Sequence, residues 1–244
     1  MKIGIYGLGR FGSFYTALLR DHFEIKVYSR NPKRETPAGV QRVSEDELLL
    51  QPVIILCVAI SAMKEVLQRI GPRLAPGNLV MDTCSVKALP VEWMEQALPE
   101  SVQILGTHPM FGPDSALGGV KDLPIILCPA RIEKQSLDIW SSFFTGLGLK
   151  VMVMDAHNHD REAATTQGIT HYLGRVLAEL KLADSEIATL GYRKLLDIIE
   201  QTCNDSWQLF FDLQLYNPYT KEVRTSLSRS LKYIDNKLDT AVRR

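Results

Sequence analysis

The chain opens with MKIGIYGLGRFG (residues 1–12), and this stretch decides the fold. Residues 2–6 are a short apolar run that predicts a buried β-strand. The G-x-G-x-x-G pattern of residues 7–12 then begins an amphipathic helix, on which we expect Phe14, Ala17 and Leu18 to face inward. Such glycines either make a tight turn that packs helix on strand, or let the backbone approach a pyrophosphate whose charge the helix N-terminus favours. The position between a strand and a helix favours the second interpretation, a dinucleotide-binding fingerprint.

The end of the second predicted strand, residues 23–28, indicates which dinucleotide is bound. An Asp or Glu there would bind the ribose 2′-hydroxyl of NAD, but residues 29–34 read SRNPKR. A hydroxyl followed by guanidinium and ammonium groups suits a 2′-phosphate, the alternative being solvated loop charges. We therefore expect NADP as the cofactor. The residues expected to bind it come from the glycine loop and from the ends of the second and third strands: Gly7, Leu8, Gly9, Arg10, Phe11, Gly12, Ser29, Arg30, Cys57 and Val58.

Alternating strand and helix signals continue to about residue 154. Apolar runs predict strands at 52–58, 79–82, 102–105, 124–128 and 150–154, the first of them apolar enough to be covered on both faces. Ser44 and Glu47 have the spacing of a capping box, and Ser61 is expected to cap the next helix. That helix should bury Met63, Val66, Leu67 and Ile70, and two more helices are expected, one with Pro90 in its first turn and one near 133–144. This order predicts an α/β fold with a parallel sheet.

Helical periodicity replaces the strand signals from residue 155 onward. We predict an N-terminal Rossmann-type NADP-binding domain over 1–154 and an all-helical domain for substrate binding and dimerisation over 155–244. A long C-terminal helix carries one apolar stripe. This stripe either packs within its own domain or forms the seam of a homodimer: Val223, Leu227, Leu231, Ile234 and Leu238.

Composition limits the class of partner. Lys plus Arg (28) equals Asp plus Glu (28), so no net charge draws the chain to nucleic acid or to an anionic membrane, and we expect a small-molecule partner. The four cysteines are widely spaced and predict reduced thiols. A strand from residue 2 leaves no room for a leader sequence, so a cytoplasmic location is expected. His157 and His159 give no settled metal geometry and are interpreted as surface or capping residues, so no metal is expected.

Two further motifs follow neighbouring predicted strands. DTCSVK (82–87) follows 79–82, and the stretch GTHPMFGP (106–113) presents His108 on what we predict to be a short, Pro- and Gly-braced turn. Both should lie at the carboxyl edge of the sheet, where ligands of open α/β folds bind. His108 can accept a proton near neutral pH, and Ser85 can bind the same oxygen and hold the imidazole. His108 and Ser85 are thus the predicted catalytic residues, a helix cap being the alternative for Ser85.

Together these motifs resemble the prephenate and arogenate dehydrogenases, most of all the plant-type arogenate dehydrogenases. The resemblance spans nearly the whole chain and rests on GLGRFG (7–12), YSR (28–30), DTCSVK (82–87), THPMFGPDS (107–115), KDLP (121–124), ITHYLGR (169–175) and the stretch 191–206. It implies NADP-linked oxidative decarboxylation, giving tyrosine from arogenate or 4-hydroxyphenylpyruvate from prephenate. It also implies that His171 binds substrate and that the protein is a homodimer.

The substrate carboxylates need partners in the helical domain. Gln167 and Arg175 are four residues to either side of His171, so all three should share one helix face and bind substrate. Many microbial prephenate dehydrogenases have an arginine before the segment 204–212, but residues 194–210 contain none. Because arogenate carries an ammonium group, we expect Asp114 to pair with it. The other interpretation of Asp114 is a loop or capping residue.

Other classes of protein compete with this assignment. Imine reductases and β-hydroxyacid dehydrogenases share the predicted architecture, but the Lys-x-x-Asn pattern expected of the second group is replaced by Lys194-Leu195-Leu196-Asp197. A regulatory protein that binds NADP without turnover is the non-enzymatic alternative. Such a protein would have no need of His108.

Overall fold

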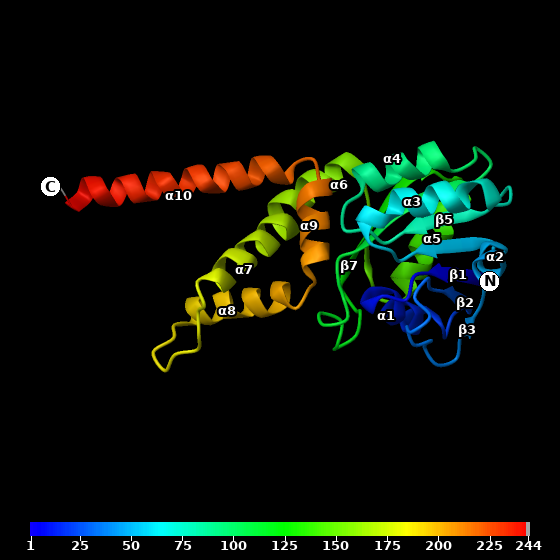
Figure 1. Cartoon of the computed structure of the whole chain (residues 1–244), viewed down its shortest axis with the longest axis horizontal. Helices are drawn as coiled ribbons and strands as arrows, with labels where there is room; N and C mark the ends of the chain where they lie inside the picture. Colours follow the sequence, from blue (N-terminus) through cyan, green and yellow to red (C-terminus); the bar gives the residue numbers. More distant parts are fainter. Residues whose placement is uncertain (243–244) are drawn as a thin grey trace. The chain divides into compact units, whose positions relative to one another are not determined.

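The computed structural model describes residues 1–242, which form two compact units divided between His159 and Asp160 (Figure 1). The division falls inside helix α6 (Ala156–Ala163). The sequence pattern placed the change to helical structure at residue 155.

The first unit is built on one sheet with strand order β3-β2-β1-β4-β5-β6-β7-β8. Its strands are β1 (Lys2–Tyr6), β2 (Glu24–Tyr28), β3 (Gln41–Arg42), β4 (Val53–Leu56), β5 (Leu79–Asp82), β6 (Gln103–Pro109), β7 (Pro124–Arg131) and β8 (Lys150–Val153). The order runs outward in both directions from β1 and β4, which is the Rossmann arrangement. The predicted α/β fold class is therefore confirmed.

One pairing differs from the expected parallel sheet. β6 and β7 pair antiparallel, with His108 opposite Ile126, whereas β7 and β8 are parallel. The residues between β6 and β7 form turns and loop instead of a crossover helix. Without a crossover helix the chain has no means of returning to start a parallel neighbour, so it reverses beside β6.

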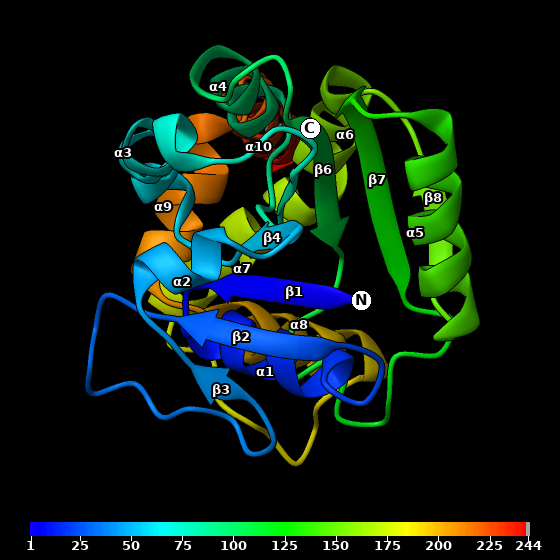
Figure 2. The same ribbon diagram turned by 90° about the vertical axis from the view of Figure 1, so that its right-hand side faces the viewer.

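Helices cover both faces of this sheet. The core cluster of one face joins the sheet to α1 (Arg10–Leu19) and α5 (Lys134–Gly146), and Figure 2 shows these two helices on the opposite side from α3 and α4. The other helices are α2 (Glu45–Leu49), α3 (Ile60–Ile70), the 3₁₀ turn η1 (Gly71–Arg73) and α4 (Ala88–Ala97). Every residue of β4 is buried, as expected for a strand covered on both faces.

Local predictions in this unit were mostly confirmed. The capping box at Ser44 and Glu47 is present, and the predicted face of α3 is buried. The prediction for Ala17 is wrong, because α1 buries Tyr15, Thr16 and Leu19 while Ala17 is exposed and Phe14 and Leu18 are only partly buried. The cap assigned to Ser61 is also wrong: α3 begins at Ile60 with Ala59 as N-cap, two residues earlier than a cap at Ser61 would place it.

The predicted histidine turn is part of a strand. β6 continues through Pro109, so His108 is a strand residue with only 3% of its surface exposed. Pairing with β7 supplies the backbone hydrogen bonds that extend β6 beyond the apolar run 102–105. His108 still lies at the carboxyl end of β6, beside the end of the parallel strand β5.

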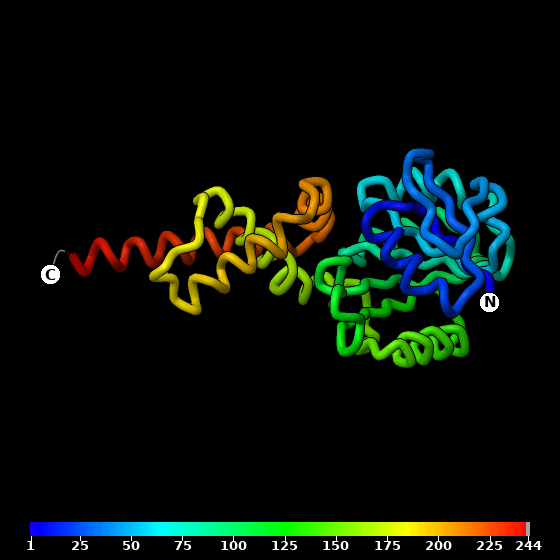
Figure 3. The backbone as a smooth tube through the Cα atoms, turned by 90° about the horizontal axis from the view of Figure 1, so that it is seen from below, coloured from blue at the N-terminus to red at the C-terminus, as the bar shows by residue number. Residues whose placement is uncertain are grey.

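The second unit is helical, as predicted. It contains the π-helical segment η2 (Ala164–Gly168), α7 (Ile169–Glu179), α8 (Leu190–Cys203), α9 (Trp207–Tyr216) and α10 (Thr220–Val242). Figure 3 shows α10 as one continuous helix. Val223 and Leu227 of the apolar stripe are partly buried near η2 and α7, but every residue from Ser228 to Val242 is exposed. None of the helices in residues 1–242 is long and apolar enough to cross a membrane.

Candidate active site

The glycine loop has the geometry of a phosphate cradle. Gly7 has φ +110°, and a Cβ on Gly12 would overlap the carbonyl oxygen of Gly7, so both positions require glycine. A Cβ on Gly9 would meet no atom of the chain within 4 Å. Gly9 is also the N-cap of α1, and it has no side chain to occupy the first-turn amides. The opening beside Gly9 and these amides together suit an anion at the helix N-terminus.

The neighbouring strand ends border this cradle. The strand order reverses between β1 and β4, which is where open α/β sheets bind ligands. The backbone N–H of Gly7 donates to the Tyr28 carbonyl (2.8 Å), and that of Cys57 donates to the Tyr6 carbonyl (2.8 Å). Burial, with a smaller contribution from Asp82 opposed by a hydrogen bond from Thr83, raises the pKa of the Cys57 thiol to about 12. Cys57 is therefore neutral and adds no negative charge to the loop.

Ser29 and Arg30 lie at the end of β2, as predicted. The side chain of Arg30 is 75% exposed and is 3.6 Å from Glu65, an ion pair that solvent weakens. The backbone around them is held by Arg42, whose Nη2 donates to the Ser29 carbonyl (3.1 Å). Sequence reasoning did not single out Arg42.

The imidazole of His108 is paired with that of His159. Its Nδ1 lies 2.8 Å from Nε2 of His159, and the two rings meet at 68°. His159 lies on α6, is only 2% exposed, and lies on the same helix face as the buried Ala163. The interpretation of His159 as a surface or capping residue is wrong. The cap is Asp155, whose Oδ1 accepts from the N–H groups of His157 and Asn158 (3.0 Å each).

A buried ion pair fixes the strand end that carries His108. Lys87 and Asp82 are both fully buried and bonded to each other, and Lys87 Nζ also donates to the Thr107 carbonyl (2.7 Å). The Thr107 N–H donates to Asp82 Oδ1 (3.2 Å), and its hydroxyl donates to the Asp82 carbonyl. The residue before His108 is thus bonded to Asp82 of β5 and to Lys87 through both its backbone and its side chain, and Lys87 has a structural role.

Ser85 lies in the loop that follows β5 and is 9% exposed. Its Oγ is buried and makes no hydrogen bond within the described chain. The prediction that Ser85 holds the imidazole is therefore not met, because His159 has that position. A buried hydroxyl without a partner is unfavourable, which suggests that a ligand atom satisfies it.

Asp114 and Arg10 form an ion pair between the loop after β6 and the glycine loop. Both side chains are about half exposed, 48% for Asp114 and 51% for Arg10. The carboxylate predicted to face an ammonium group thus already has a cationic partner.

In the second unit, the three polar residues predicted to bind substrate lie on successive helical turns, as their spacing predicted: Gln167, His171 and Arg175. Gln167 lies in η2 and not in a regular α-helix, and π-helical segments often occur at functional sites. Each residue leaves one buried polar atom without a partner in residues 1–242: Gln167 Oε1, His171 Nδ1 and Arg175 Nε. Arg175 also donates to the Asp205 carbonyl (2.5 Å) and stacks over Trp207 at 4.4 Å.

Burial lowers the pKa of His171 from its ordinary value of 6.5; Asp205 opposes this shift and Arg175 adds to it. His171 is therefore neutral at pH 7.

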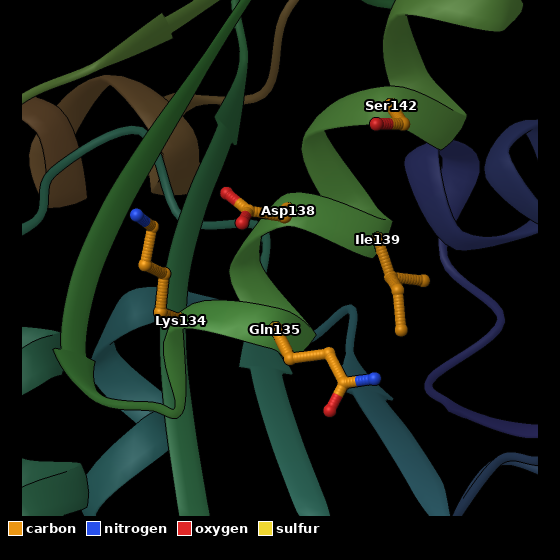
Figure 4. Close-up of a pocket in the computed structure, with 5 residues that line it drawn as sticks. All are labelled: Lys134, Gln135, Asp138, Ile139 and Ser142. Atoms are coloured by element: carbon orange, nitrogen blue, oxygen red, sulfur yellow. The ribbon is translucent and has the colours of Figure 1, made fainter.

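A hollow on α5 is a surface feature away from these groups. Figure 4 shows that all its lining side chains come from one stretch of that helix, and Ile139 among them is 54% exposed. Within residues 1–242 we find no group of three or more His, Cys, Asp or Glu side chains that could hold a metal ion. Cys57, Cys84, Cys128 and Cys203 are free thiols.

Family models match both units. The model described as prephenate dehydrogenase, nucleotide-binding domain, matches residues 16–153. The chain belongs to the prephenate dehydrogenase family. A second model, described as TYRAAT1-like, C-terminal domain, matches residues 176–244. A nucleotide-binding dehydrogenase domain of this family implies a nicotinamide cofactor.

Individual members of the family agree with this assignment. Arogenate dehydrogenase 1, chloroplastic, of Arabidopsis thaliana is 36% identical over 91% of this chain and 37% of its own length. Arogenate dehydrogenase 2, chloroplastic, of the same plant is 32% identical over 98% and 70%. The chain thus spans little more than a third of the first relative. The crystal structure of A. aeolicus prephenate dehydrogenase with hydroxyphenyl propionate and NAD+ has the same fold, with a TM-score of 0.79, 17% identity, and coverage of 100% of this chain and 92% of that one.

Proposed function

We propose that this chain catalyses the NADP-dependent oxidative decarboxylation of arogenate to tyrosine. The observation that carries the proposal is the buried His108–His159 pair at the carboxyl end of β6, in a Rossmann unit whose glycine loop forms a phosphate cradle. Membership of the prephenate dehydrogenase family supports the reaction class. The two plant relatives named as arogenate dehydrogenases support the substrate.

His108 is the base of the reaction. Oxidation of the ring carbinol requires loss of the hydroxyl proton while a hydride leaves the same carbon, and a nicotinamide held at the glycine loop would supply the acceptor for that hydride. Nδ1 of His108 is engaged with His159, so we assign Nε2 to the substrate hydroxyl. Carbon dioxide then leaves C1, its bonding electrons make the ring aromatic, and the oxygen takes the proton back from His108. The proton balance is therefore zero, and the protein supplies positioning and one reversible proton transfer.

This role fixes the tautomers of the pair. His108 accepts a proton at Nε2 only if its own ring proton is on Nδ1, where it donates to Nε2 of His159. His159 then has its proton on Nδ1. When His108 becomes an imidazolium, the same hydrogen bond becomes charge-assisted and stabilises it. His159 is thus a positioning residue that selects the basic tautomer of His108.

Ser85 is assigned to the same substrate oxygen. Its buried Oγ makes no hydrogen bond within residues 1–242, and it lies in the loop after β5, the strand next to β6. A hydroxyl in this position donates to the oxygen once His108 has taken its proton.

The cradle fits a dinucleotide. The open side of Gly9 and the uncapped start of α1 suit a pyrophosphate, and Ser29 with the exposed Arg30 suits a 2′-phosphate. We assign the cofactor to residues 7–12, Ser29, Arg30, Cys57 and Val58. The A. aeolicus structure holds NAD+, so the preference for NADP rests on Ser29 and Arg30 of this chain.

The carboxylates of the substrate are assigned to the second unit. Gln167, His171 and Arg175 each have a buried polar atom without a partner in the described chain. Such atoms are costly unless a ligand satisfies them. Arg175 reaches Asp205 and Trp207, so it takes the place of the arginine that residues 194–210 lack.

Asp114 is proposed to favour arogenate by pairing with its ammonium group in exchange for Arg10. Asp114→Asn should then lower the ratio of kcat/KM for arogenate to that for prephenate. Asp122→Asn, at an exposed carboxylate of the same β6–β7 connection, is the control. An unchanged ratio in Asp114→Asn would rule out this role.

The deciding experiment is to measure initial rates with arogenate and prephenate, each with NADP and with NAD. Turnover of arogenate with NADP is expected. A preference for prephenate would keep the family and overturn the assignment of Asp114 and Arg175. Retained NADPH binding without turnover of either substrate would favour a cofactor-sensing protein.

A homodimer is proposed from the exposed part of α10. Leu231, Ile234 and Leu238 are 57%, 54% and 61% exposed at helical spacing, which is an apolar stripe that a second copy would cover. Light scattering should give twice the chain mass, and Leu231→Glu with Leu238→Glu should give the monomer. A cytoplasmic location remains our prediction, although both plant relatives are named chloroplastic.

A further inference from the structure

The segment that follows β2 has little to hold it in one conformation. Residues 30–36 are all exposed, so burial contributes little to their order. Two local hydrogen bonds turn the chain at Asn31: Lys33 N–H to its Oδ1 (2.9 Å) and Arg34 N–H to its carbonyl (3.3 Å). Yet this segment starts with Ser29 and Arg30, the residues to which the proposed function assigns the 2′-phosphate.

The side chain of Arg42, a residue of the sheet, binds this segment through hydrogen bonds to its backbone. Its Nη1 donates to the carbonyls of Arg34 (2.6 Å) and Pro32 (3.4 Å), and its Nη2 donates to those of Asn31 (2.9 Å) and Ser29 (3.1 Å). One planar guanidinium therefore binds four carbonyl oxygens of a six-residue stretch, which we call the Arg42 clasp.

The clasp is anchored on a regular element. Arg42 belongs to β3 and pairs with Val27 of β2, and the N–H of the next residue, Val43, donates to the Val27 carbonyl (3.0 Å). The backbone of Arg42 is thus fixed beside Val27 of β2, and Val27 is two residues before Ser29.

The clasp also sets which way the peptide groups point. In a planar trans peptide the carbonyl and the next N–H point in opposite directions. Because the Ser29 carbonyl points to Arg42, the N–H of Arg30 points away from it. The clasp therefore leaves the N–H of Arg30 on the side of the peptide away from Arg42, where Arg42 does not compete for it.

We propose that Arg42 is a positioning residue for cofactor specificity, which preorders residues 29–34 to receive the 2′-phosphate of NADP. This inference rests on the proposed NADP preference. NADP should bind tightly because the segment is ordered beforehand, so little conformational entropy is lost on binding. NAD, which has no 2′-phosphate, gains nothing from the clasp.

The Arg42→Lys substitution distinguishes two possible effects of Arg42 on NADP binding, the ordering of residues 29–34 and the attraction of its positive charge for the phosphate. Arg42→Lys keeps the positive charge near the phosphate, but a single ammonium group cannot reproduce a planar fork that binds four carbonyls. Long-range attraction alone predicts no loss in this variant, whereas positioning predicts a loss.

The test is fluorescence titration of the whole chain with NADPH and with NADH, for wild type, Arg42→Lys and Arg42→Met. The control is Arg20→Met, which removes an arginine that donates to the Ala38 carbonyl (2.9 Å) and lies 3.8 Å from Asp21, both outside residues 29–34. Both Arg42 variants should weaken NADPH binding about tenfold, the order expected for loss of charge-assisted hydrogen bonds, and NADH binding less than twofold. Arg20→Met should change neither value.

Hydrogen exchange and a double variant complete the test. The amides of Lys33 and Arg34, which donate to Asn31, should exchange faster in Arg42→Lys. Arg30→Ala should reduce the further effect of Arg42→Met, because Arg42 acts through Arg30. Equal weakening of NADPH and NADH, or NADPH affinity unchanged in Arg42→Lys, would overturn the proposal. Equal affinity of the wild type for NADPH and NADH would instead overturn the proposed NADP preference. The wild-type titrations alone test that preference, so its failure can be distinguished from a failure of the role proposed for Arg42.

Discussion

His108 and His159 are 51 residues apart in the sequence, yet their ring nitrogens lie 2.8 Å apart in the interior of the first unit. This contact leaves two arrangements of the ring protons, and the proposed role of His108 as the base requires the one in which its own proton is on Nδ1 and His159 Nε2 is the acceptor. Removing the acceptor, Nε2 of His159, should leave His108 in place but allow the tautomer with its proton on Nε2, which cannot take a proton from the substrate hydroxyl. We therefore expect His159→Leu to lower kcat about 100-fold, at the lower end of general-base effects, with little change in NADPH affinity.

His159→Gln is the matched variant, since its Oε1 can accept from Nδ1 of His108. It should recover much of the lost activity, which a merely structural role for His159 would not explain. His157→Leu, at an exposed position on the same helix, is the control. Full activity in His159→Leu would refute the role of the pair.

The Asp82–Lys87 pair predicts a large effect on stability. Lys87→Met would leave the fully buried Asp82 carboxylate without its cation, which typically costs about 3–5 kcal/mol in the free energy of unfolding. Asp82→Asn combined with Lys87→Met should recover part of that loss, because the buried charge is gone. Urea denaturation of the wild type and these two variants measures both values. A loss below about 1 kcal/mol in Lys87→Met would contradict this account.

Much of the first unit could be predicted from the sequence, because its elements are specified locally. Apolar runs located every strand of the sheet except the two-residue β3 (Gln41–Arg42), which has no apolar residue, and the glycine pattern located the start of α1. The errors occurred where tertiary contacts decide. His108 was expected on a turn because Pro and Gly follow it, but pairing with β7 extends the strand through it. Ala17 was assigned to the wrong face because the buried face of α1 is set by the sheet below it.

The partners in the site were harder to predict than its members. His159 lies in the polar stretch AHNHD, which gives no hydrophobic signal of burial. The sequence holds one weak signal, the apolar Ala163 four residues after His159, which places both on one helix face. The structure buries both residues. Arg42 donates to backbone carbonyls, which every residue type has, so no sequence pattern identifies its partners. Arg10 and Asp114 are far apart in the sequence, so no spacing rule pairs them.

The lowered pKa of His171 predicts how stability depends on pH. Burial disfavours the charged imidazolium, so between the lowered pKa and 6.5 the unfolded chain binds more protons than the folded one. Stability then rises with pH across this window, and it falls as the pH drops below 6.5. His171→Gln should remove this part of the dependence, so its stability relative to wild type should improve from pH 7 to pH 5. Urea denaturation at these pH values, with His22→Gln as an exposed control, measures the difference; parallel curves would argue against it.

Gly9 and Gly12 provide a paired test of the phosphate cradle. A Cβ on Gly12 would overlap the Gly7 carbonyl oxygen, so Gly12→Ala should destabilise the first unit itself. A Cβ on Gly9 meets no atom of the chain within 4 Å, and its φ of −72° suits any residue, so Gly9→Ala should keep the Tm within a few degrees. The added methyl would occupy the space proposed for the pyrophosphate, and NADPH affinity should therefore fall at least about tenfold. Thermal unfolding and NADPH titration of the two variants measure these effects. Unchanged NADPH affinity in a folded Gly9→Ala variant would place the cofactor elsewhere and remove the basis for assigning the hydride acceptor to this loop.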